Sequence, residues 1–208
     1  ICRTLNFSRV WMIEIEVPFF PARPVFTALS PMTEGLSRTP GMPYNIKEQP
    51  TLTFVARQKG EAWNRPFVAI YEPSSVKEPG CIAEVSFPEV KSKTENSATS
   101  ICVVQKDGRI DYILSSDTPT DICTSGKMSA QATYALWGNK KGDDCTFFLG
   151  HGTLLSTPNV VIKAETPADV LLEFKKGTWY YTASTDCTVS IQKKTYKLKA
   201  NTEEKTLK

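Results

Sequence analysis

Apolar and polar residues alternate along much of the chain with a period of two. In residues 10–17, Trp11, Ile13 and Ile15 are separated by Met12 and Glu14. Residues 81–87 repeat the pattern, with small or apolar side chains at every second position. Because successive side chains of a strand point to opposite faces of a sheet, this pattern predicts strands with one buried face.

Runs of this kind recur at short intervals from residue 52 onward. Their connections are polar, and we expect Asp107 and Gly108 to supply the positive φ angles of a tight hairpin turn. We find no convincing amphipathic helix. The sequence therefore predicts an all-β fold, an antiparallel β-sandwich of about 12–14 short strands, with closure into a barrel left open. The strands predicted from here on are 52–57, 67–71, 81–87, 100–105, 109–116, 130–137, 145–150, 159–164, 169–174, 178–183, 187–192 and 195–200.

Prolines interrupt the pattern early in the chain. Residues 30–50 contain Pro31, Pro40, Pro43 and Pro50. Proline has no backbone donor and a fixed φ angle, so we expect residues 30–50 to form a long irregular loop. With 208 residues in total, we expect residues 1–208 to form one β-sandwich domain.

Charge and hydrophobicity exclude two classes of partner. The net charge is only +3, and the densest basic cluster, Lys193, Lys194, Lys197 and Lys199, would not share one face of a strand. We therefore expect no nucleic-acid partner. No apolar run is long enough to span a membrane. Residues 1–20 lack the pattern of a signal peptide and the chain begins at Ile1, so we expect a removed leader or a longer parent protein.

The cysteines and the single histidine argue against a metal centre. There are six cysteines and no CxxC pair, so we expect no zinc site. The cysteines have two interpretations, at least one disulfide or simple burial as small apolar side chains. The strand-like surroundings of Cys102 and Cys187 suit burial. The acidic turn at Asp143 and Asp144 does not match a calcium loop. We expect no metal and no cofactor.

His151 is the one histidine, in the sequence FFLGHGTLLS. It could act as a general base, but the chain has no GxSxG motif to supply a nucleophile on a defined turn. A turn histidine without a catalytic role is the interpretation that we favour.

Aromatic residues are the other candidates. Exposed flat rings stack on sugars, whereas Trp and Tyr also fill sandwich cores. In residues 178–183, the neighbours Trp179 and Tyr180 must point to opposite faces of a strand, so one of them lies away from the main core unless a loop covers it. We take Trp179 and Tyr181 as candidate carbohydrate-binding residues, with packing in the core or under a loop as the favoured alternative.

Two segments resemble a known family. Residues 52–73, LTFVARQKGEAWNRPFVAIYEP, and the hairpin 103–113, VVQKDGRIDYI, resemble the C-terminal β-sandwich portion of heparinase II/III-like polysaccharide lyases. The resemblance implies an exported bacterial protein in which a helical toroid precedes the sandwich. The family eliminates across a uronic acid with a Tyr and a His or Asn. No position here matches that catalytic motif, so we assign no catalytic residue.

The loop before Phe67 has two interpretations. It is a structural lead into a strand if Pro66 sets the backbone, Trp63 caps the core and Arg65 reaches Glu61 or Glu72. It is a binding site if Trp63 and Arg65 hold an acidic sugar. We favour the structural role and keep both residues as candidate carbohydrate contacts.

The function that we expect is therefore a non-catalytic β-sandwich, similar to the accessory domain of an exported polysaccharide lyase. Its partners would be an acidic polysaccharide and a helical toroid domain, and its location periplasmic or secreted. The alternative is an active lyase or hydrolase built on His151 and nearby tyrosines.

Overall fold

The computed structural model describes residues 2–7, 10–15, 23–29, 35–41, 51–57, 68–74, 79–140 and 144–207. These residues form strands, turns and loops, with no helix long and apolar enough to cross a membrane among them. The prediction of an all-β, antiparallel fold is confirmed. Contacts within the chain define two compact units, Ile1–Glu78 and Pro79–Lys208. Each is described by itself, and one domain over residues 1–208 stays a prediction.

The first unit contains two antiparallel sheets. One has the strand order β1-β2-β3-β6, and the other pairs β4 with β5. Strand β4 lies inside the segment 30–50 that we expected to be irregular, so that expectation does not hold for these seven residues. Pro40 pairs with Leu52 there. A sheet of two strands has only edges, where proline is tolerated. The bounds are β1 Cys2–Phe7, β2 Val10–Ile15, β3 Arg23–Leu29, β4 Gly35–Gly41, β5 Thr51–Arg57 and β6 Ala69–Ser74.

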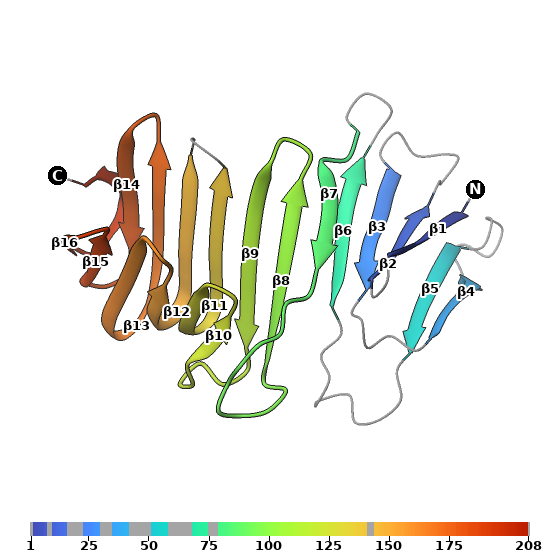
Figure 1. Cartoon of the computed structure of the whole chain (residues 1–208), viewed down its shortest axis with the longest axis horizontal. Helices are drawn as coiled ribbons and strands as arrows, with labels where there is room; N and C mark the ends of the chain where they lie inside the picture. The colour runs from blue at the N-terminus through green and yellow to red at the C-terminus, as the bar shows by residue number, and fades with distance from the viewer. Residues whose placement is uncertain are drawn as a thin grey trace. The chain divides into compact units, whose positions relative to one another are not determined.

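The second unit is one open antiparallel sheet of eleven strands, drawn from green to red in Figure 1. The main path is β16-β15-β13-β12-β11-β9-β8-β7, with β10 beside β11, and β14 joining β13 to β17. The bounds are β7 Ile82–Ser86, β8 Ala98–Gln105, β9 Arg109–Ser116, β10 Cys123–Ser125, β11 Met128–Lys140, β12 Cys145–Ser156, β13 Val160–Lys175, β14 Thr178–Ala183, β15 Cys187–Ile191, β16 Lys194–Leu198 and β17 Asn201–Thr206.

Three long strands run through two layers of this unit. The first part of β11 pairs with β10 and its second part with β9, while β13 pairs first with β15 and then with β14. The register of β12 breaks around Gly152, where an added Cβ would collide with the Cβ of Ala132. Such bulges bend strands. The sheet therefore folds over itself at β11, β12 and β13.

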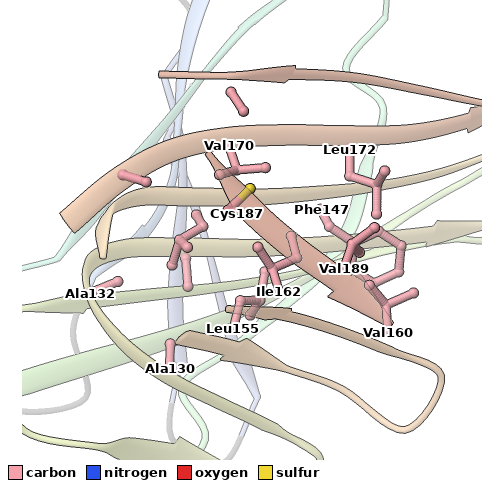
Figure 2. Packing of buried hydrophobic residues seen from close by; sticks show 14 of the residues in the cluster. Ala130, Ala132, Phe147, Leu155, Val160, Ile162, Val170, Leu172, Cys187 and Val189 are labelled. Carbon is pink, nitrogen blue, oxygen red and sulfur yellow. The ribbon is translucent and has the colours of Figure 1, made fainter. Parts of the chain in front are cut away.

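The core lies between the two halves of the bent sheet. Leu155, Ile162 and Val189 come from one half, and Leu149 and Leu172 from the other, all with no exposed surface. Figure 2 labels Leu155, Ile162, Leu172 and Val189 within this cluster. Two layers that enclose apolar side chains make a β-sandwich. Replacing such a residue by alanine costs about 2–5 kcal/mol, so this core holds the strands of the second unit in place.

Candidate functional site

Trp179 and Tyr181 lie on the core-facing side of β14, whereas Tyr180 is not part of the core cluster, in line with the alternation of neighbours. Tyr181 is 9% exposed and belongs to the core cluster. Trp179 is half-buried, and its ring centroid lies 6.1 Å from that of Phe147 and 5.0 Å from that of Phe174. This packing gives both rings a structural role, and contact with carbohydrate stays a prediction. Trp63 and Arg65 lie outside the described residues.

His151 is exposed and sits at the β12 bulge with a φ angle of 48°. Ser184 and Asp169 lie beside it, which brings a serine, an aspartate and a histidine together. Their hydrogen bonds use the backbone, however. The N–H of His151 donates to Asp169 Oδ1 at 2.8 Å, and the N–H of Asp169 donates to Ser184 Oγ at 2.9 Å. The carboxylate therefore fixes the bulge and does not orient the imidazole as a triad requires.

Four thiols of the second unit are buried or half-buried and therefore poor nucleophiles; the exposed Cys81 is not one of them. Cys102, Cys123, Cys145 and Cys187 are free. Burial raises the pKa of Cys102 and of Cys145, and burial together with Asp186 raises the pKa of Cys187 to about 11. Because the thiolate is the reactive form, these groups behave as small buried hydrophobes at neutral pH. No group of three His, Cys, Asp or Glu that could hold a metal occurs in the described part of the chain.

Two aromatic rings from neighbouring strands, β9 and β11, stack on the core-facing side of the sheet. Tyr112 of β9 is directly opposite Trp137 of β11, with ring centroids 5.0 Å apart and planes 23° apart. Both pack against the core cluster. Desolvation, with a smaller contribution from Cys102, raises the pKa of the Tyr112 hydroxyl. This pair therefore stabilises the sandwich.

The opposite side of the same strands carries a second apolar set. Ile113, Leu136, Phe148 and Leu171 are cross-strand neighbours, one each from β9, β11, β12 and β13. They alternate with core residues, are half-buried and do not belong to the core cluster. Tyr134, two residues before Leu136 on the same face, is 55% exposed. We call these five residues the outer face.

Two glycines shape the surface around these residues. Gly150 is opposite Tyr134, and an added Cβ there would lie 2.8 Å from Cε1 of Phe148. The phenyl ring therefore occupies the space above Gly150. At the other end of the strand, an added Cβ on Gly138 would lie 2.5 Å from both Nη2 of Arg109 and Oδ1 of Asp111. The missing side chains let a ring and a guanidinium lie close to the backbone.

Arg109 is held in place by polar contacts. Its Nε donates to Asp111 Oδ1 at 2.8 Å, while Gln105 Nε2 donates to Asp111 Oδ2 at 2.9 Å. The Arg109 side chain is 33% exposed and that of Asp111 13%. A guanidinium fixed through Nε keeps its two terminal nitrogens for another acceptor.

Sequence reasoning missed Tyr134, Phe148 and Arg109 as functional candidates. The alternation of side chains along a strand could have shown that Tyr134 points away from the core, because its neighbour Ala135 is a small core residue. The register that puts Gly150 across from Tyr134 depends on the bulge, which the pattern of hydrophobic residues does not reveal.

Comparison with known proteins gives one relative. The chain is 27% identical over 157 residues to an endo-acting ulvan lyase of Formosa agariphila, a match that covers 72% of this chain and 18% of that protein. The chain thus spans less than a fifth of the length of the curated relative that it matches. No family model matches. No solved structure matches either. The chain is therefore related in sequence to a polysaccharide lyase.

Proposed function

We propose that the chain is a non-catalytic β-sandwich of a polysaccharide lyase-related protein, in contact with the polysaccharide or supporting a catalytic domain. The observation that carries the proposal is the 27% identity to an endo-acting ulvan lyase over 72% of the chain. The closer resemblance to heparinase II/III-like lyases, a helical toroid partner, and a secreted or periplasmic location belong to the proposal too.

The non-catalytic role is supported by the chemistry of the second unit. Elimination across a uronic acid needs a base for the ring proton, an acid for the leaving oxygen and a group that neutralises the carboxylate. The Asp169 carboxylate hydrogen-bonds to the backbone of His151 and not to its ring. Burial raises the pKa of Cys187, so its thiol is protonated at neutral pH.

An active lyase or hydrolase remains the second candidate because of one feature. Tyr134 is directly opposite Gly150, the residue before His151, and both Tyr134 and His151 are exposed. A tyrosine and a histidine one residue apart across a strand pair could serve as acid and base.

The two candidates differ in turnover. The full chain is incubated with ulvan, heparin, chondroitin, alginate and hyaluronan, and unsaturated uronic product is followed by absorbance while binding is measured in parallel. The proposal expects binding without product. Product that disappears in His151→Ala or Tyr134→Phe would establish the enzymatic alternative.

A further inference from the structure

We propose that the outer face, together with Arg109, binds a short segment of a carboxylate-bearing polysaccharide. This inference rests on the proposed role in carbohydrate contact and assigns that role to a surface. The juxtaposition that carries it is an exposed tyrosine in the middle of β11 beside the Phe148 ring of β12, with the fixed guanidinium of Arg109 from β9 near the C-terminal end of β11.

The first step is the exposure of Tyr134. Among the described residues, the exposed large hydrophobic side chains are Tyr134 at 55% and Ile122 at 54%. Ile122 lies in the loop before β10, whereas Tyr134 lies in the middle of a sheet. An exposed ring contributes little to folding, and a tyrosine offers an apolar face with a polar hydroxyl. These are the two properties needed to contact a sugar ring.

The second step is the flat surface beside Tyr134. The Phe148 ring occupies the space above Gly150, and Cβ of Tyr134 lies 3.3 Å from the position of an added Cβ on Gly150. Leu136 and Phe148 are direct cross-strand partners on the same face. The Phe148 ring lies against the sheet and the Tyr134 side chain projects beside it. The C–H face of a pyranose can stack on the first ring while the second borders its edge.

The third step is the guanidinium of Arg109. Asp111 engages Nε, Gln105 engages the second oxygen of Asp111, and the missing side chain of Gly138 lets Nη2 lie against the backbone. The terminal nitrogens are therefore oriented before a ligand arrives, and a guanidinium recognises a carboxylate in a bidentate geometry. Asp111 partly offsets the positive charge, so we expect recognition by geometry and only moderate dependence on salt.

The fourth step is distance along the strand. Tyr134 and Gly138 are four residues apart in β11, or about 13 Å at the rise of an extended strand. Leu136 lies between them on the same face. A single sugar ring is too short to contact both ends, so the ligand is an oligosaccharide with an apolar ring face at Tyr134 and a carboxylate at Arg109.

The test measures affinity for uronate oligosaccharides from ulvan and alginate, and for the same oligosaccharides after chemical reduction of their carboxyl groups. Tyr134→Ala is compared with Ile122→Ala, which removes an equally exposed side chain elsewhere. We expect Tyr134→Ala to weaken binding about tenfold, the loss of one good aromatic contact, with an unchanged melting temperature. We expect Ile122→Ala to bind like the natural chain.

Arg109→Lys keeps the positive charge and removes the planar fork. We expect it to weaken binding of the uronates and to leave binding of the reduced oligosaccharides unchanged. Uronate binding that survives both Tyr134→Ala and Arg109→Lys would overturn this inference and leave the proposed function standing. An absence of binding by the natural chain would contradict the carbohydrate-contact role itself. A monomer released from a dimer by Tyr134→Ala would mean that a second copy occupies the face.

Discussion

At the scale of single residues, exposure divides the aromatic side chains by what they do. Tyr181 is 9% exposed and lies in the core, while Tyr134 is 55% exposed on the outer face. A buried ring stabilises the fold through the area that it removes from water, and an exposed ring does not. Trp179 belongs to the first group because it packs on Phe147 and Phe174.

Trp179→Ala should therefore destabilise the chain far more than Tyr134→Ala. The half-buried indole loses two ring contacts, so we expect a fall of about 2–3 kcal/mol in the free energy of unfolding. Tyr134→Ala should change it by about 0.5 kcal/mol or less, as exposed substitutions do. Denaturant unfolding of both variants measures the difference, and equal losses would contradict the assignment of the two rings.

The buried thiols predict a stability that depends on pH. The pKa of Cys187 is raised from 9.0 to about 11 in the folded chain. Above the ordinary value the unfolded thiol ionises while the folded one stays protonated, so protons favour the folded state. The free energy of unfolding should fall as the pH rises through the window from 9.0 to about 11.

Urea unfolding across that window checks this expectation. Cys102 and Cys145 shift in the same direction, so Cys187→Ala should make the decline shallower without removing it. A free energy of unfolding that rises with pH in this window, or an unchanged slope in Cys187→Ala, would contradict the burial of this thiol.

At the scale of elements, the bulge of β12 determines how the sheet bends and where the outer face ends. His151 has a φ angle of 48° there, a left-handed conformation that costs a residue with a side chain about 1–2 kcal/mol. Gly150 and Gly152 flank it, and both positions lack room for a Cβ. The two glycines therefore allow the strand to bend at this point, and the bend imposes the left-handed conformation of His151.

His151→Gly should therefore leave the fold intact and change the free energy of unfolding by about +1 kcal/mol at most, because relief of strain is offset by the greater flexibility of glycine in the unfolded chain. His151→Val should destabilise the chain, since a branched side chain tolerates this φ angle poorly. Thermal melting of the pair gives the comparison. A glycine variant that melts well below the natural chain would show that the imidazole itself stabilises the bulge.

The strands of the second unit could be predicted from the alternation of apolar and polar residues. That two predicted strands form one long strand could not be predicted. Residues 159–164 and 169–174 read as two runs because Thr166 and Pro167 interrupt the pattern. In the structure they form one strand, β13, whose interrupted part lies outside the β12 register. The same limit applies to the candidate site. Alternation separated Trp179 from its neighbour Tyr180, but burial depends on the layer above, which neighbouring residues do not encode.

At the scale of the whole molecule, the chain divides into two units, and the second is an open bent sheet with a core inside and the outer face on the strands β9, β11, β12 and β13. The matched part of the chain corresponds to 18% of an endo-acting ulvan lyase. The Asp169 carboxylate beside His151 accepts a hydrogen bond from the backbone N–H of that residue. This arrangement supports the proposal that turnover belongs elsewhere.

The most direct test is the absorbance of unsaturated uronic product during prolonged incubation of the full chain with ulvan, at a concentration where binding is saturated. We expect the chain to bind the polysaccharide and the absorbance to stay at that of ulvan alone. A steady rise that is abolished in His151→Ala would contradict the account, because it would make the exposed histidine a catalytic residue.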